Sequence, residues 1–200
     1  MSWLDRQFGR PSGLAGRLVG ALMAHSNREL NAWTVELLGV KDGERVLEVG
    51  FGPGIGVEHL ARTSRAAFIA GVDHSPLMVQ QARRRNAAFV QEGRVELRWA
   101  SVSALPFGDS SFDKAFCVNS IQFWPDPQDN LREVQRVLRP GGLVAVTLQP
   151  RWAEAESTVA GVGQQLVALV AGAGFADVRL ASRSMRPVGA LCATGVRPPT

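Results

Sequence analysis

A glycine-rich turn between a buried strand and a helix narrows the possible folds of this sequence more than any other segment. The short apolar run at residues 45–49 is typical of a strand, and a helical pattern begins at Ile55. Between them, Gly50, Gly52 and Gly54 stand at alternate positions. Such glycines let the main chain turn sharply and come close to a ligand. The turn therefore predicts a ligand-binding loop at the carboxyl end of the first strand of an α/β sheet.

The rest of the chain alternates short apolar runs with longer helical patterns, which is typical of βαβ units and a mainly parallel sheet. Ser75 is a good N-cap for a helix that starts at Pro76. The predicted fold class is α/β, a Rossmann-like doubly wound sheet with helices on both faces. The predicted strands are 45–49, 67–72, 95–99, 114–118, 143–148, 178–180 and 190–193, and the predicted helices are 55–63, 76 onward, 127–138 and 156–171.

Composition fits a single globular domain over residues 1–200, with 46% hydrophobic and 20% charged residues. No stretch reaches the ~20 uninterrupted apolar residues that cross a bilayer, so no membrane span is expected. The net charge of +4 comes from scattered arginines, and the run at residues 83–85 is more typical of a solvated helix face than of a nucleic-acid site. Cys117 and Cys192 are too few for a disulfide framework or a metal cluster. We therefore expect a cytoplasmic protein without a metal.

An amphipathic helix is expected near the N-terminus, where Leu14, Leu18, Leu22 and His25 recur at helical spacing. The same segment resembles a signal peptide in its preceding arginines and small residues. Arg17 interrupts its apolar part, which favours the helix.

The spacing of the glycines excludes two common nucleotide motifs. A dinucleotide fingerprint needs G-x-G-x-x-G, but Ile55 stands at the third position counted from Gly50 and Gly52. A phosphate loop needs Gly-Lys followed by Ser or Thr, and no lysine lies near the turn. The loop therefore predicts a ligand other than a dinucleotide or a nucleoside triphosphate.

Asp73 closes the second predicted strand, about 20 residues beyond the glycine loop. An acidic side chain at that place in a nucleotide-binding βαβ unit accepts hydrogen bonds from ribose hydroxyls. The alternative is that Asp73 only caps the helix that begins at Pro76. The glycine loop favours the ribose contact.

Four segments in this order resemble the class I S-adenosylmethionine-dependent methyltransferases, in the small-molecule group called type 11 or ubiquinone-biosynthesis-like. The resemblance covers residues 40–148 and rests on residues 48–56, 71–73, 105–113 and 136–142. It implies a seven-stranded sheet with six parallel strands and a final antiparallel one. It also implies three parts of one domain: a helical lid (1–40), a cofactor-binding core (41–148) and a C-terminal helix with the last two strands (149–200).

The resemblance further implies which residues bind S-adenosyl-L-methionine. Glu48 would organise the loop, Asp73 would bind the ribose hydroxyls, and His74 would border the adenine. Residues expected against the rest of the cofactor are Gly50, Phe51, Gly52, Gly54, Asn119 and Ser120. The family commonly has an acidic residue for the adenine amino group where this chain has Ser101, so the Ser101 hydroxyl or the Val102 backbone would make that contact.

Methyl transfer from a sulfonium is an in-line displacement, so catalysis here would depend mainly on proximity and orientation. His25, at the end of the predicted lid helix, is the candidate general base for an acceptor that must lose a proton. His59 falls inside a helix and is more typical of an ordinary structural position. The side chains expected to border a small-molecule substrate are Trp33, Ile121, Phe123 and Trp124.

Other functions stay open at this point. A non-catalytic S-adenosylmethionine-binding protein would keep the same loop, and an NAD-dependent oxidoreductase would need the glycine spacing that is missing. RNA or protein methylation is less favoured, because residues 119–122 read Asn-Ser-Ile-Gln and lack the Asn/Asp-Pro-Pro-aromatic signature of many amino-group methylases. A monomer or a homodimer is expected.

Overall fold

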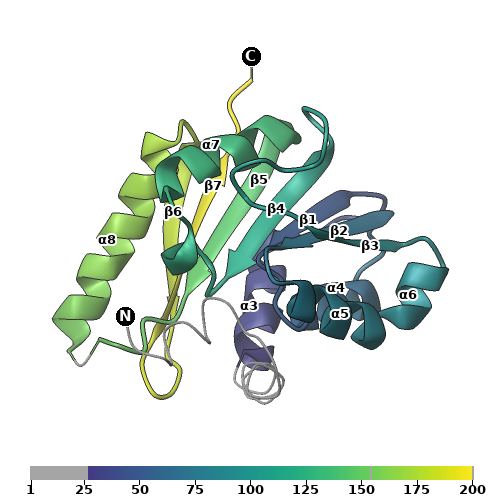
Figure 1. Ribbon diagram of the computed structural model, residues 1–200. Coiled ribbons are helices and arrows are strands. Elements are labelled where there is room, and N and C mark those ends of the chain that lie inside the picture. The colour runs from purple at the N-terminus through teal and green to yellow at the C-terminus, as the bar shows by residue number, and fades with distance from the viewer. Residues whose placement is uncertain (1–26, 154, 200) are drawn as a thin grey trace.

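The computed structural model describes residues 27–153 and 155–199 of the chain, and Figure 1 shows their arrangement. The helices are α3 (Arg28–Leu38), α4 (Ile55–Thr63), α5 (Pro76–Arg85), α6 (Ala87–Gln91), the 3-10 helix η1 (Ile121–Phe123), α7 (Pro127–Val137) and α8 (Glu156–Gly172). The strands are β1 (Arg45–Val49), β2 (Phe68–Asp73), β3 (Val95–Trp99), β4 (Phe112–Val118), β5 (Leu138–Leu148), β6 (Ala176–Arg183) and β7 (Ala190–Val196).

The strands form one seven-stranded sheet in the order β3-β2-β1-β4-β5-β7-β6. Strands β1 to β5 pair in parallel, whereas β7 is antiparallel to both β5 and β6. Six strands therefore run one way and β7 runs the other. This confirms the predicted fold class and the single antiparallel strand.

Helices cover both faces of the sheet, as predicted (Figure 1). Successive residues of a strand point to opposite faces, so Val46 packs with α3, α4 and α5, whereas Leu47 packs with α7 and α8. Both side chains are fully buried. The sheet thus separates two apolar cores, and only its edges at β3 and β6 lack a neighbouring strand within the described chain.

Local sequence signals place most element boundaries correctly. Ser75 caps α5, since its hydroxyl accepts a hydrogen bond from the Met78 N–H at 3.4 Å. The turn at residues 139–142 differs from the prediction, because β5 already starts at Leu138 and its pairing with β4 then skips to Leu143. The turn is therefore an excursion within β5 and not a linker before it. The short elements α6 and η1 were not predicted, because five and three residues are too few for a periodic pattern.

Helix α3 packs against α4, β4 and β5 and belongs to the core. Leu30, Trp33 and Leu38 are buried, and the Thr34 hydroxyl lies 2.8 Å from the Thr147 hydroxyl of β5. The remainder of the predicted lid, including His25, lies outside the described residues, so its role stays a prediction.

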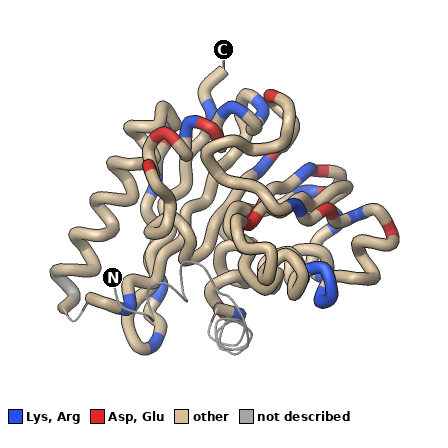
Figure 2. The backbone as a smooth tube through the Cα atoms, in the orientation of Figure 1, with Lys and Arg blue, Asp and Glu red and all other residues tan. Residues whose placement is uncertain are grey.

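Lys and Arg residues are spread over several elements, with one run at the end of α5 (Figure 2). Within this run, Arg83 donates to the Leu97 carbonyl at 2.8 Å. Arg85 donates to the Pro53 carbonyl at 2.9 Å and pairs with Glu58 at 3.1 Å. Two of the three arginines therefore hold α5 to β3 and to the glycine loop.

Both cysteines are free and buried. Burial raises the pKa of the Cys117 thiol to about 12 and that of Cys192 to about 11, which keeps both thiols neutral near pH 7. Within residues 27–153 and 155–199, no cluster of His, Cys, Asp and Glu could hold a metal ion, and no helix is long and apolar enough to span a membrane. The thiols are therefore packing residues.

Replacing Lys114 with Met is expected to lower the free energy of unfolding by about 3 kcal/mol. Lys114 is nearly buried, and its ammonium donates to the Leu38 and Gly39 carbonyls at the end of α3 and pairs with Glu44 at 3.4 Å. The variant leaves these groups without their donor. Urea denaturation measures the change, with Lys41→Met on the exposed surface as the control. Equal stability of the two variants would contradict this account.

Candidate active site

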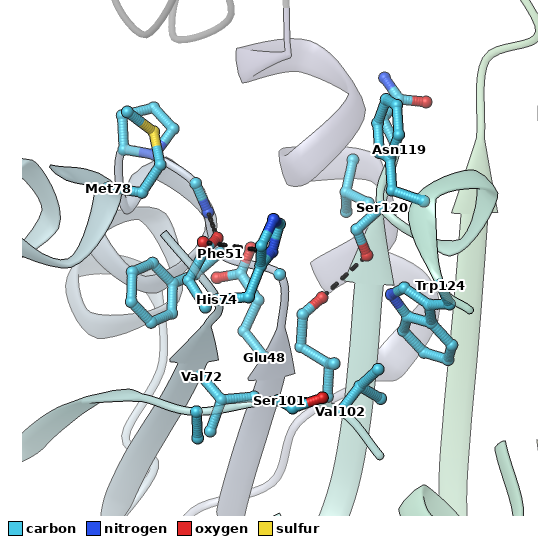
Figure 3. Close-up of a pocket in the computed structure, with 18 of the residues that line it drawn as sticks. Glu48, Phe51, Val72, His74, Met78, Ser101, Val102, Asn119, Ser120 and Trp124 are labelled. Carbon is cyan, nitrogen blue, oxygen red and sulfur yellow. Dashed lines mark hydrogen bonds and ion pairs between the residues drawn. The ribbon is translucent and has the colours of Figure 1, made fainter. Parts of the chain in front are cut away.

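A cavity of about 380 Å³ opens at the carboxyl ends of β1, β2 and β4 (Figure 3). The strand order reverses between β1 and β4. From β1, the chain continues to β2 and β3 on one side of the sheet, and then returns to place β4 and β5 on the other side of β1. Open α/β sheets bind their ligands at such a reversal. The predicted loop therefore lies where the topology creates a crevice.

The glycine loop follows β1 and lies along one wall of the cavity. The Gly50 N–H donates to the Val72 carbonyl at 2.8 Å, and the Gly52 N–H donates to Asp73 Oδ2 at 2.8 Å. Gly54 does not line the cavity. Its φ is +81°, and a Cβ there would lie 2.7 Å from the Ala82 Cβ, so Gly54 lets the loop pack against α5.

Asp73 connects the loop with the start of α5. Its Oδ2 accepts from Gly52, and its Oδ1 accepts from the Ser75 N–H at 2.8 Å. Burial raises the pKa of this carboxyl group, and the two N–H donors oppose that rise by stabilising the charged form. Each oxygen keeps a further acceptor position, because a carboxylate has about four. Asp73 lines the cavity, so it can hold the loop and still accept from a ligand.

The end of the cavity near β2 and β3 is mainly apolar. Phe51, Val72, Met78 and Val102 line it together with half-exposed His74, as Figure 3 shows. Ser101 also lines this end, and its hydroxyl accepts from the Ser103 N–H at 3.2 Å. A flat heterocycle with one polar edge suits such a surface.

The opposite end of the cavity follows β4. Asn119 has a φ of +49°, and its Oδ1 accepts from the Gln149 N–H at 2.8 Å. The Ser120 hydroxyl donates to the Val49 carbonyl at 2.9 Å, which joins this segment to β1 (Figure 3). Phe123 and Trp124 complete the wall. This end therefore offers amide groups and aromatic surface.

Two side chains expected at the substrate pocket lie elsewhere. Trp33 is buried between α3 and the sheet, with the Arg183 guanidinium 5.7 Å from its ring centre. Ile121 is buried in the core on the α7 side, because the first residue of η1 points inward. Neither lines the cavity, whereas Phe123 and Trp124 do. His59 also lies outside the lining.

Several lining residues were missed by the sequence analysis, among them Asn27, Asn31, Ile55, Met78 and Ala100. Asn27 and Asn31 stand four residues apart, so they share one face at the start of α3. Two amide side chains at that spacing are the sequence signal that could have indicated their place at the cavity. The sequence gives no such signal for Met78, since an apolar residue in an amphipathic helix is ordinarily a core residue.

Taken together, the fold and the cavity define a nucleoside-binding Rossmann-like protein of the class I methyltransferase type. A family model described as a methyltransferase domain matches residues 47–146. The chain is 34% identical over 184 residues to the uncharacterized methyltransferase YdaC of Bacillus subtilis, a match that covers 92% of this chain and 99% of YdaC. This chain belongs to that methyltransferase family.

Two further relatives are similar over smaller shares of their length. The ubiquinone/menaquinone biosynthesis C-methyltransferase UbiE of Geotalea daltonii is 32% identical over 121 residues, which are 60% of this chain and 52% of UbiE. The structure of phosphoethanolamine N-methyltransferase 2 of Haemonchus contortus in complex with S-adenosyl-L-methionine has a TM-score of 0.69 at 19% identity, covering 86% of this chain and 53% of that one. The protein is an S-adenosylmethionine-dependent methyltransferase.

Proposed function

We propose that this methyltransferase transfers the methyl group of S-adenosyl-L-methionine directly to a small-molecule acceptor. The observation that most supports this is one cavity that joins the Asp73 end to the aromatic end after β4. Donor and acceptor would then meet within one continuous cavity. The volume of about 380 Å³ lies within the usual range for small-molecule sites, ~300–1,000 Å³.

The cofactor would lie along the glycine loop. Asp73 would accept from the ribose hydroxyls with the acceptor positions that its two backbone contacts leave free. Gly50 and Gly52 would lie against the methionine and ribose parts, and Asn119 with Ser120 beneath the sulfonium. The apolar surface around Phe51 and His74 would hold the adenine, with Ser101 or the Val102 backbone at its polar edge. Glu48, at the cavity wall, and Gly54, packed against α5, would shape the loop.

S-adenosyl-L-methionine supplies a methyl group on a positively charged sulfur, a leaving group that needs no further activation. The protein therefore acts chiefly by holding the acceptor atom in line with that methyl group. The titratable side chains among the described lining residues are Glu48, Asp73 and His74, which lie at β1 and β2. The described acceptor end thus holds no general base, and His25 remains the candidate for that role. Contact with Phe123 and Trp124 favours an apolar or aromatic acceptor.

The test is a transfer assay with methyl-labelled cofactor and a panel of small phenols, carboxylic acids, amines and thiols. For an acceptor found in this way, Trp124→Ala is expected to lower kcat/KM by at least about tenfold, because the variant removes part of the acceptor wall. Trp152→Ala, which removes a half-exposed tryptophan outside the cavity, is the matched control.

Two results would contradict the proposal. Tight cofactor binding without transfer to any member of a broad panel would favour the non-catalytic binding protein. Calorimetric titration in which NAD binds and S-adenosylhomocysteine does not would favour the oxidoreductase.

A further inference from the structure

Two buried oxygen atoms without hydrogen-bond partners lie close to Gly56, on residues that line the cavity. Glu48 on β1 is 2% exposed and Asn31 on α3 is 5% exposed. Glu48 Oε2 and Asn31 Oδ1 have no partner within the described chain. Both lie 2.6 Å from the position that a Cβ on Gly56 would occupy, so the two oxygens converge on the space that this glycine leaves.

An ionised Glu48 would leave both oxygen atoms without a donor from the described chain. Asn31 Nδ2 donates to the Asn27 carbonyl at 2.8 Å, so the amide nitrogen already has its partner and Oδ1 does not. A carboxylate and an amide oxygen are both acceptors, and buried acceptors without a donor are costly. One proton on Glu48 Oε2 supplies the missing donor.

The charges around Glu48 also disfavour its ionised form. The charged group that interacts with it is Asp73 at the end of β2, and the nearby thiol of Cys117 on β4 is neutral near pH 7. Helices α3 and α4 bring only neutral groups: Asn31, Gly56 and the Val57 N–H, which donates to the carboxyl group. Within the described residues, no basic side chain forms an ion pair with Glu48. Burial raises the pKa of Glu48 well above its usual value, Asp73 adds to the rise, and the Val57 hydrogen bond opposes it.

We propose that Glu48 is a neutral carboxylic acid in the folded protein and donates its O–H to Asn31 Oδ1, which fixes the glycine loop to helix α3. Glu48 is then a positioning residue. Glu48 takes this neutral form in the free protein, whatever the methyl acceptor is.

The bond continues a series of hydrogen bonds across the site. Asn31 donates to the Asn27 carbonyl, and Asn119 Nδ2 donates to Asn27 Oδ1 at 3.1 Å. The Gln149 N–H in turn donates to Asn119. The neutral acid therefore links the cofactor loop, through α3, to the segment after β4.

Infrared difference spectroscopy tests the protonation state directly. Near neutral pH in heavy water, the wild type is expected to show the carbonyl band of a protonated carboxyl group. The band should be lost in Glu48→Gln and kept in Asp73→Asn, the other buried carboxyl of the cavity. A wild type without the band, or a band lost in Asp73→Asn and kept in Glu48→Gln, would overturn the proposal.

The pH dependence of stability gives a second readout. Because the pKa of Glu48 is raised in the folded state, its contribution to stability is present below the usual glutamate pKa and is lost as pH rises toward the folded value. Unfolding above the usual pKa releases the proton to water. Glu48→Gln should remove this loss, since its amide can donate to Asn31 and accept from Val57. The expected result is a variant whose urea midpoint exceeds that of the wild type at pH 8 and approaches it at pH 4.

Glu133→Gln is the matched control. It makes the same chemical change at a glutamate whose pKa is lowered in the folded state instead of raised. Hydrogen bonds from Arg136 lower the pKa of Glu133, so its contribution to stability is present above the usual pKa and is lost as pH falls. A Glu48→Gln variant with the same pH dependence as the wild type would show that Glu48 is ionised, and would overturn the proposal.

Measurements of cofactor binding show whether Glu48 acts by positioning the loop or by a negative charge. Glu48→Leu should weaken binding of S-adenosylhomocysteine by at least about tenfold, because it loses one hydrogen-bonded contact. Glu48→Gln should keep most of the wild-type affinity, because its amide can still donate to Asn31. If Glu48→Gln binds as weakly as Glu48→Leu, the negative charge acts on the ligand and the neutral-acid proposal fails.

Discussion

The Asp73→Ala variant is expected to bind S-adenosylmethionine and S-adenosylhomocysteine at least about a hundredfold more weakly than the wild type. The carboxylate accepts from Gly52 in the loop and from Ser75 at the start of α5, and we propose that it also accepts from the ribose. Losing hydrogen bonds to a charged group costs about 3 kcal/mol in total. Isothermal titration calorimetry measures the change against a wild-type Kd near micromolar, about −8 kcal/mol.

A ligand without ribose hydroxyls separates the two roles of Asp73. If the carboxylate contacts the ribose, a 2′,3′-dideoxy analogue of S-adenosylhomocysteine should lose much less affinity in Asp73→Ala than the parent compound does. Asp113→Ala is the matched control, because Asp113 also accepts a backbone N–H, from Arg45, but lies outside the cavity. Undiminished affinity in Asp73→Ala would show that the ribose is bound elsewhere.

The Gly50→Ala variant is expected to lose about 3 kcal/mol of stability and nearly all cofactor binding. Gly50 has a φ of +75°, and a Cβ there would lie 2.5 Å from the Ser120 Cβ and 2.8 Å from its Oγ. The substitution combines backbone strain with a clash that pushes the loop away from the segment after β4. Urea denaturation and calorimetric titration of one preparation report both effects.

Gly93→Ala isolates the backbone part of this effect. Gly93 has a φ of +73°, but no heavy atom lies within 4 Å of an added Cβ. That variant should lose only the conformational cost, about 1–2 kcal/mol, and bind the cofactor normally. Equal losses of stability and affinity in the two variants would contradict the proposed contact between Gly50 and Ser120.

The parts of the structure that were predicted correctly depend on short-range chemistry. Strand β1 and helix α4 have the bounds that the apolar pattern and the glycines indicate, and Ser75 caps α5 as its side chain and the following proline suggest. Gly50, Gly52 and Asp73 line the cavity because they stand at the ends of strands, and parallel strands bring their carboxyl ends to one edge of the sheet. These signals lie within a few residues of the atoms they position.

Side chains whose direction depends on tertiary packing were not predictable in this way. Trp33 and Asn31 are two residues apart on α3, yet one is buried beside Arg183 and the other reaches the cavity. Ile121 and Phe123 are likewise separated by one residue, and the 3-10 helix sends them to different surroundings. Which side chain faces the ligand depends on how each helix rotates against the sheet, and the local pattern does not contain that rotation.

The position of β7 has a consequence for the order of events during synthesis. β6 joins the sheet only through β7, which is made after it and lies between it and β5. β1 to β5 form a continuous run of parallel pairings with one another. The described residues that line the nucleoside crevice all lie before α7, so each of them has been synthesised before β6 and β7 are made.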